Sequence, residues 1–250
     1  VKRADLIVTT TEFSRREIMR ILHVPSEKIV VVPHGVRTEF TERLSEARIS
    51  DVRARYRIGQ QYILSLNDIH PRKNLDGLVE AFGHLKSRTG LPHQLVIAGR
   101  SLLPYPEFYR RVENSQFADD IKVLGFVPSE DVLALYQGAA LFVYPSFYEG
   151  WGLQVHEAMI AGVPVTVANN TTLPEIAGDA ADTFDPHDPY DMSRSMERVL
   201  TDTALRDTLV AKALVWVKRY SWRQAAEATL AACVSVGTER GKAAAYSYYP

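Results

Sequence analysis

The sequence predicts a Rossmann-like, doubly wound α/β fold with a parallel sheet. Short apolar runs of strand length alternate along the chain with segments of helical periodicity, which is typical of this class. One run, LFVYP at residues 141–145, leads into a glycine-punctuated turn, a helical segment and another apolar run. A strand, a glycine-rich turn and a helix in this order present backbone N–H groups to an anion. Ligands of such sheets bind beyond the carboxyl ends of the strands.

The elements follow in order from hydrophobic periodicity and from the turn residues that interrupt it. Residues 11–24 form an expected amphipathic helix, with Phe13, Ile18, Ile21 and Leu22 on one side. Gly162 and Pro164 end the helix that starts at residue 153. The expected strands are 6–10, 28–33, 62–66, 94–98, 121–124, 141–145, 163–167 and 181–186. The expected helices are 44–57, 75–88, 106–116, 129–137 with Ser129 and Glu130 as its cap, 153–161, a short one after 173, and three after Pro189.

Bulk properties narrow the function classes. The chain has 250 residues and a net charge of −1, so its charge gives no reason to expect nucleic acid as a partner. Cys233 is the only cysteine, which excludes an internal disulfide and suits a reducing compartment. No apolar run approaches the ~20 residues that span a bilayer, and no charged-then-apolar leader stands at Val1. We therefore expect a cytoplasmic location.

Two glutamates and two cations are the candidate site residues. Glu157 lies among apolar helix neighbours, where a carboxylate needs a hydrogen-bonding partner. Arg72 and Lys73 stand at the start of an expected helix, where the helix dipole disfavours cations, and a bound anion would resolve this conflict. The alternatives are that Glu157 faces solvent, that Glu149 only favours a helix start, and that the two cations are solvated.

Other chemistries receive little support from the residues. The seven histidines include no pair at the HExxH spacing, so we expect no metal site. His156 is interpreted as a helix-surface residue, and His34 and His70 as loop residues without a ligand role. Gly150-Trp151-Gly152 lacks the third glycine of a dinucleotide fingerprint, and no phosphate-loop GK[ST] is present. Trp151, between two glycines, has little regular structure to pack it.

A family resemblance adds to these observations. Glu149 and Glu157 stand eight residues apart and enclose G-W-G-L, and the chain continues HEAMIAGVPV…LPEIAGDAA. Over some forty residues this stretch resembles the paired-glutamate signature of retaining glycosyltransferases of family 4, which have the GT-B fold. One position departs from the family pattern: Asn67 stands where many members carry an arginine six residues before the lysine. Arg72 or Arg100 could substitute for it.

The resemblance implies residue roles. Glu149 would orient the donor sugar, and Lys73 would neutralise the leaving diphosphate; these are the two candidate catalytic residues. Glu157 would accept hydrogen bonds from the ribose hydroxyls, and backbone near Val127 would hold the base. The remaining candidate donor-binding residues are Gly150, Trp151, Gly152, Leu153, Arg72 and Arg100. No metal or other cofactor is expected, because the nucleotide sugar is the substrate.

The resemblance also implies a domain organisation and an activity. Residues 1–40 would be a remnant of the N-terminal Rossmann domain and hinge, 41–220 the nucleotide-sugar-binding GT-B domain, and 221–250 a C-terminal helix and tail. The chain would be the donor half of a hexosyltransferase that moves a sugar, with GDP-mannose slightly favoured, to a glycan or lipid-linked acceptor with retention, in polysaccharide biosynthesis. A peripheral membrane contact would run through the missing half.

Three alternatives stay open at this point. A nucleotide-sugar epimerase of the same architecture would interconvert sugars without transfer. A binding fragment would hold a nucleotide sugar and turn nothing over. A purely structural α/β domain would bind no nucleotide at all.

Overall fold

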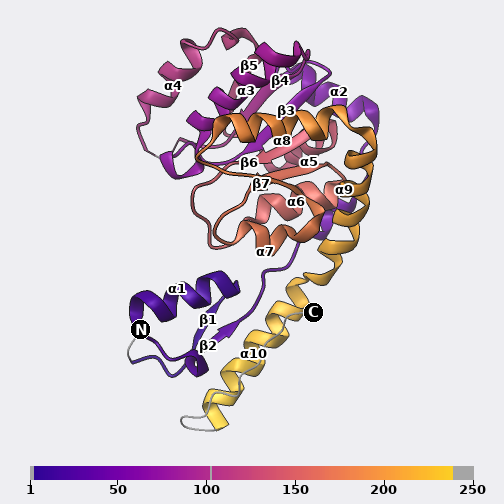
Figure 1. Cartoon of the computed structure of the whole chain (residues 1–250). Helices are drawn as coiled ribbons and strands as arrows, with labels where there is room; N and C mark the ends of the chain where they lie inside the picture. Colours follow the sequence, from indigo (N-terminus) through magenta and orange to yellow (C-terminus); the bar gives the residue numbers. More distant parts are fainter. Residues whose placement is uncertain (1–2, 102, 239–250) are drawn as a thin grey trace.

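The computed structural model describes residues 3–101 and 103–238, which form a larger and a smaller unit (Figure 1). The larger unit is built on a six-stranded sheet in the order β5-β4-β3-β6-β7-β8, and every neighbouring pair is parallel. This confirms the predicted doubly wound α/β class. The strands are β3 (Tyr62–Leu66), β4 (Gln94–Ala98), β5 (Ile121–Gly125), β6 (Leu141–Tyr144), β7 (Val165–Ala168) and β8 (Asp182–Phe184).

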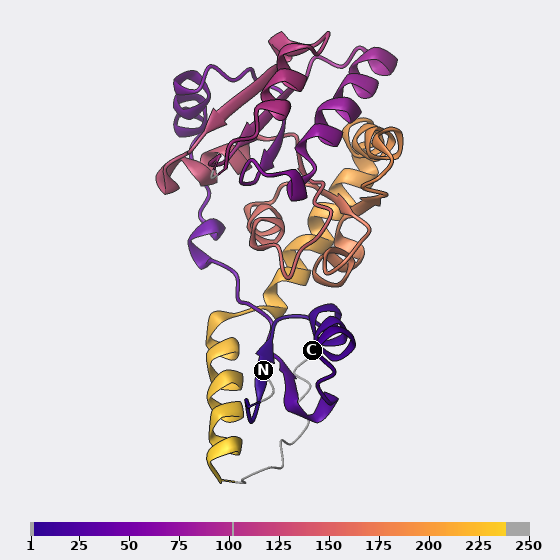
Figure 2. The same ribbon diagram turned by 90° about the vertical axis from the view of Figure 1, so that its left-hand side faces the viewer.

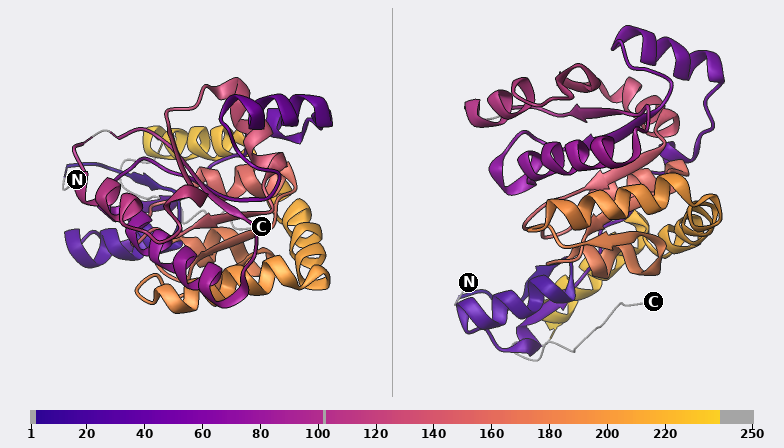
Figure 3. Two further views of the ribbon diagram at one scale, coloured as in Figure 1. Left: turned by 90° about the horizontal axis from the view of Figure 1, so that it is seen from above. Right: turned by 45° about the horizontal axis from the view of Figure 1, so that its top comes forward.

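Helices cover both faces of this sheet (Figure 3). α3 (Leu75–Thr89) packs against α8 (Pro189–Thr201), and α5 (Ser129–Gly138) packs against α6 (Leu153–Ala161). The other helices of the larger unit are α2 (Glu46–Arg55), α4 (Pro106–Glu113), α7 (Leu173–Ala177) and α9 (Thr203–Trp216). β3, β6 and their neighbours β4 and β7 are buried almost throughout, because both faces of the sheet are covered.

The strand order reverses between β3 and β6. From β3 the chain moves outward to β4 and β5, then returns through α5 to β6 and moves outward in the other direction. The loops that follow β3 and β6 therefore leave the carboxyl edge of the sheet in opposite directions. This switch point is where open α/β sheets place their ligands.

The smaller unit contains both ends of the described chain. β1 (Ile7–Thr9) and β2 (Ile29–Val31) form a parallel pair, and α1 (Glu12–Leu22) connects them. The long helix α10 (Trp222–Thr238) returns from the larger unit and lies beside these strands (Figure 2). Val30, Val32, Ala228 and Ala232 form a small separate core between the strands and α10.

The amphipathic helix expected over 11–24 is present as α1, but none of its residues is buried, and Ile21 is 55% exposed. One local expectation needs correction. Ser129 does not cap α5, because it is already the first helical residue and the cap position, Pro128, has no side chain to donate or accept. The expectation of a loose tail over 241–250 lies outside the described residues. In the described part of the chain, no helix is long and apolar enough to cross a membrane.

Candidate functional site

Lys73 is positioned by a short, rigid loop after β3. Residues Pro71–Lys73 form one turn of 3₁₀ helix, and the His70 ring accepts a hydrogen bond from the Arg72 amide at 3.1 Å. Asn74 follows in the left-handed conformation, which Asn tolerates better than most residues. Its side-chain amide donates to the carbonyls of Pro145 and Pro186 at 3.1 and 2.8 Å. These bonds fix the loop against the ends of β6 and β8 and leave Lys73 buried.

The ammonium of Lys73 meets the carboxylate of Glu149, which comes from the loop after β6. Lys73 Nζ lies 2.6 Å from Glu149 Oε1, and the Arg72 guanidinium lies 3.0 Å from the same oxygen. Ser146 Oγ donates to that oxygen at 2.6 Å. Lys73 also donates to the Tyr144 hydroxyl at 3.0 Å. The predicted conflict at the start of α3 is therefore resolved within the chain, and the interpretation of Lys73 as a solvated charge is wrong.

The carboxylate of Glu149 is ionised in this cluster. Burial by itself raises the pKa of the Glu149 carboxyl, but the charge of Lys73, the hydrogen bonds from Lys73 and Ser146, and the charge of Arg72 outweigh burial, so its pKa lies below the ordinary value. Among the directly paired groups one ionised carboxylate thus faces two cations, and Asp68 lies close enough that its charge also acts on the Tyr144 hydroxyl. An anionic ligand would find its favourable contacts at Lys73 and Arg72 themselves.

Glu157 is buried one helical turn into α6, so the interpretation of a solvent-facing side chain is wrong. Its carboxylate accepts a hydrogen bond from the Tyr136 hydroxyl at 3.1 Å and lies 3.4 Å from the Arg37 guanidinium. Burial raises the pKa of Glu157 above its ordinary value, and the charge of Arg37 with the bond from Tyr136 only partly offsets this. The carboxylate has few partners for its depth, and hydroxyl donors of a ligand would supply more.

The two glutamates are joined through Gln154. The single proton of the Tyr144 hydroxyl is shared between Glu149 Oε1 at 3.4 Å and the Gln154 side-chain oxygen at 3.3 Å, while the Tyr136 hydroxyl lies 3.4 Å from the Gln154 carbonyl. The structure therefore brings Arg72, Lys73 and Glu149 into direct contact, and Glu157 is connected to them through three intervening residues, Tyr144, Gln154 and Tyr136.

The glycine turn between the glutamates is held from the next loop of the sheet. Gly152 precedes α6 with φ of 142°, and a Cβ there would also lie 3.0 Å from Ile176, so only glycine fits. Thr172 Oγ1 donates to the Trp151 carbonyl at 3.0 Å, and the Glu149 amide donates to Thr171 Oγ1 at 3.3 Å. The turn that carries Gly150 and leads into Leu153 is thus fixed rather than free.

Trp151 and His156 lie in the interior, against expectation. The Trp151 ring stacks on His34 at 5.4 Å between ring centres and meets the edges of His156 and Tyr220. His156 is 1% exposed, and its Nε2 bonds to the Ile176 carbonyl at 2.8 Å, so its interpretation as a surface residue is wrong. Burial lowers the pKa of His156 to about 4, which keeps the ring neutral.

A pocket of about 190 Å³ opens beside the cluster, at the ends of β3, β4 and β5. Gly99 and Val127 line it, and Arg100 covers the Phe126 ring with its guanidinium carbon 4.2 Å from the ring centre. Asp68 is the carboxylate in the lining. Arg100 and Val127 therefore belong to this neighbouring pocket, whereas Arg72 belongs to the cluster around Glu149.

Sequence reasoning missed several residues of the site. Arg37 reaches Glu157 from the segment that links the two units, 120 residues away along the chain, and no local pattern marks it. Tyr136 and Tyr144 resemble ordinary core residues, although their buried hydroxyls contact the two glutamates. Ser146 could have been found, because it stands three residues before Glu149 in the same turn.

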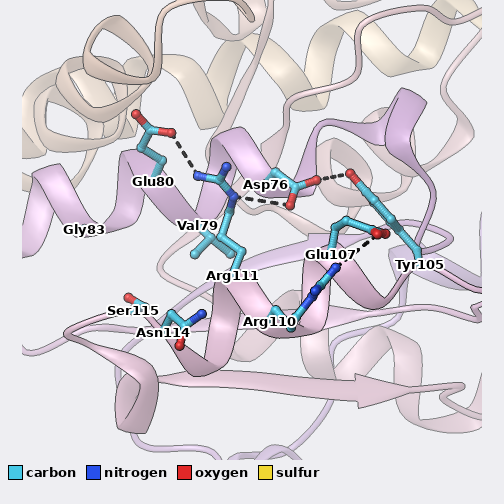
Figure 4. Close-up of a pocket in the computed structure, with 10 residues that line it drawn as sticks. All are labelled: Asp76, Val79, Glu80, Gly83, Tyr105, Glu107, Arg110, Arg111, Asn114 and Ser115. Atoms are coloured by element: carbon cyan, nitrogen blue, oxygen red, sulfur yellow. Dashed lines mark hydrogen bonds and ion pairs between the residues drawn. The ribbon is translucent and has the colours of Figure 1, made fainter.

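A second hollow lies away from these residues, between α3 and α4 (Figure 4). Its volume is about 890 Å³, but its charges pair with one another: Arg111 contacts Asp76 and Glu80, and Arg110 contacts Glu107. It contains none of the predicted site residues. Within residues 3–101 and 103–238, no group of three or more His, Cys, Asp or Glu side chains could hold a metal ion.

The fold and the site define a Rossmann-like domain with Arg72, Lys73 and Glu149 gathered at its topological switch point. Residues 50–216 match the family model described as "Glycosyl transferases group 1", and the chain belongs to this family. The site belongs to a glycosyltransferase domain.

Relatives and solved structures agree with this membership. The chain is 36% identical to "O-antigen chain mannosyltransferase B" of Escherichia coli over 91% of its length and 60% of that protein. It is 32% identical to "Serotype-specific mannosyltransferase WbdA" of Escherichia coli over 90% of its length and 28% of that protein. The chain thus spans less than two thirds of the length of each of these relatives. Among solved structures, a glycosyltransferase from Rickettsia africae has a TM-score of 0.83 at 18% identity, covering 94% of this chain and 64% of that one. Anabaena Alr3699/HepE in complex with UDP and glucose has a TM-score of 0.81 at 17% identity, covering 94% and 64%. These matches show the GT-B glycosyltransferase fold.

Proposed function

We propose that this chain is the donor-binding half of a retaining glycosyltransferase of family 4 that transfers mannose from GDP-mannose to a glycan or lipid-linked acceptor. The observation that carries the proposal is the cluster at the switch point in which two cations, Arg72 and Lys73, share the single carboxylate of Glu149. Two relatives named as mannosyltransferases support mannose as the sugar. Polysaccharide biosynthesis in the cytoplasm is the setting that we infer.

In this proposal the diphosphate lies against Lys73 and Arg72. Cations aimed at the departing phosphate stabilise the charge that develops in the transition state, so the reaction needs no metal. When the donor binds, the ion pair between Glu149 and Lys73 weakens, and Glu149 orients the sugar. The amides of Gly150 to Leu153 at the start of α6 contact the sugar and phosphate. Trp151 acts through packing, because it is buried and its ring contacts His34, His156 and Tyr220.

Glu157 and the neighbouring pocket hold the nucleoside. The buried Glu157 carboxylate accepts hydrogen bonds from the ribose hydroxyls, and the charge of Arg37 favours the ionised form of this carboxylate. The base enters the pocket between Arg100 and the backbone near Val127. Residues 1–40 then represent the end of an N-terminal Rossmann domain and hinge, 41–220 the donor domain, and 221–250 a helix and tail that return to the first domain. The missing half would carry the acceptor site and any peripheral membrane contact.

Calorimetric titration of the chain with GDP and UDP tests this proposal, with Glu157→Ala as the main variant. We expect at least roughly tenfold weaker GDP binding, because the loss of hydrogen bonds to a charged group corresponds to ~1.4 kcal/mol or more. Glu227→Ala is the matched control, since it removes an exposed carboxylate on α10 and should bind GDP like the parent chain. Equal affinity of parent and Glu157→Ala, with the fold intact by circular dichroism, contradicts the assignment.

A product assay separates the proposal from two of its alternatives, an epimerase and a binding fragment. The chain is incubated with GDP-mannose and an oligomannoside acceptor, and the sugar products are separated by chromatography. Elongated acceptor supports transfer, whereas an epimerised sugar without elongation indicates an epimerase of the same architecture. Tight GDP binding with neither product indicates that the chain alone is a binding fragment.

A further inference from the structure

A carboxylate of the larger unit caps a helix of the smaller one. Glu175 stands in the first turn of α7, and its two oxygens accept hydrogen bonds from the backbone amides of Glu12 at 2.7 Å and Phe13 at 3.0 Å. Those amides belong to the first turn of α1. The partners are 163 and 162 residues apart along the chain, so this contact joins the two units directly.

The contact satisfies groups that the helix cannot satisfy itself. The first amides of a helix have no intrahelical acceptor, and the positive end of the helix dipole favours a negative charge there. Thr11 caps the Ser14 amide, which leaves the amides of residues 12 and 13 for Glu175. The Glu12 side chain pairs with Arg15 at 3.4 Å and does not compete for this place.

Two more contacts connect the same end of α1 to the turn that carries Glu149. Thr10 Oγ1 donates to the Gly150 carbonyl at 2.8 Å, and the Phe13 ring meets the Tyr148 ring at 5.7 Å between centres. The residue before α7, Thr172, donates to the Trp151 carbonyl of this turn as well. Glu175 is thus the charged member of a set of contacts that places α1 against the glycine turn.

We propose that Glu175 is a positioning residue, which fixes the smaller unit against the Glu149 turn and thereby sets how the two sides of the transferase face each other. The role acts through α1 and the turn: the two oxygens of Glu175 bond to the amides of Glu12 and Phe13, and Glu175 is not among the residues that line the pocket at Arg100. Measurements on the chain without nucleotide distinguish a failure of this role from a failure of the proposed function.

One set of variants is used to measure both the protection of the first amides of α1 and the distance between the two units. Glu175→Ala removes both acceptors, Glu175→Gln keeps one oxygen, and Asp179→Ala is the control that removes an exposed, Lys212-paired carboxylate from the neighbouring turn. Hydrogen exchange of the Glu12 and Phe13 amides is followed by NMR. Distances between spin labels are measured in a Cys233→Ser background with labels at Ile21→Cys and Asp207→Cys, both exposed positions.

We expect exchange at Glu12 and Phe13 to be at least roughly tenfold faster in Glu175→Ala, because a charge-assisted hydrogen bond is lost at each amide. Glu175→Gln should be intermediate, and Asp179→Ala should match the parent. The distribution of distances between the spin labels should be broadest in Glu175→Ala, intermediate in Glu175→Gln and unchanged in Asp179→Ala. The amides of β3 and β4 should keep their protection from hydrogen exchange in all three variants. Unchanged exchange and unchanged distances in Glu175→Ala overturn the proposal. Because Glu175→Gln keeps the side-chain shape, its result decides the question if Glu175→Ala fails to fold.

Discussion

The two units bury their apolar side chains to very different degrees. In the larger unit, α3 presents a continuous buried stripe, and Phe82 at its centre is completely inaccessible. In the smaller unit, Ile21 is 55% exposed, Val8 is 44% exposed, and the sheet has two strands. A two-stranded sheet is marginal by itself. The larger unit therefore carries its own stability, whereas the smaller one depends on packing against α10, on the linker and on the hydrogen bonds from Glu175 to the first turn of α1.

Truncation of one apolar side chain in each unit should separate them most clearly. Phe82→Ala leaves a cavity in the larger core and should cost about 3–5 kcal/mol of unfolding free energy. Ile21→Ala removes a side chain that is mostly in water and should change it by less than about 0.5 kcal/mol. Urea denaturation followed by circular dichroism measures both. A similar cost for the two variants would contradict the contrast in burial.

His156 should make the larger unit sensitive to acid. Its pKa is about 4 when folded, against an ordinary value of 6.5, so the unfolded chain takes up the proton first. The stability that the neutral ring contributes is complete above pH 6.5 and is lost as the pH falls toward 4, by roughly 3 kcal/mol. His156→Gln, which can still donate to the Ile176 carbonyl, should lack this part of the pH dependence.

Urea titrations at pH 7 and at pH 4 measure how much unfolding free energy each protein loses between these pH values, and the loss in His156→Gln is then subtracted from the loss in the parent. Other titrating groups, including His34 and His93, whose pKa values burial also lowers, contribute equally to both proteins and cancel. The same pH dependence in both proteins would mean that the folded His156 ring titrates normally.

Much of the larger unit could be predicted because its signals are local. Gly162 ends α6 with a φ of 82°, and the bounds predicted for β3, β4 and α6 agree with the structure. Lys73 and Glu149 could be expected at one edge because each follows a parallel strand, and the two strands turned out to flank the switch point. Such reasoning uses only strand order and residue type.

The remainder depends on contacts that no local pattern records. Arg37 reaches Glu157 from a linker whose path is fixed by packing between the units. The surface interpretation of His156 failed because α6 is buried on nearly all sides, and a helix without a polar face gives its polar residues no way to solvent. The amphipathic pattern of α1 was real, yet nothing in it says whether another layer covers the apolar side.

The junction between the units offers the smallest of the expected effects. A Cβ on Gly35 would lie 2.0 Å from the Trp222 amide nitrogen and 2.5 Å from the Ser221 carbonyl carbon, so Gly35→Ala must displace the backbone where α10 begins. We expect a loss of about 1–3 kcal/mol, and a change in tryptophan fluorescence, since the Trp222 ring lies 5.3 Å from that of His34. Gly83→Ala is the matched control: it lies in α3 with open space around its Cβ and should gain up to about 1 kcal/mol from helix propensity. Changes of opposite sign in the unfolding free energy of Gly35→Ala and Gly83→Ala would show that the cost at Gly35 comes from its close approach to the backbone of α10. Equal changes would mean that the cost comes from the loss of a glycine at either position.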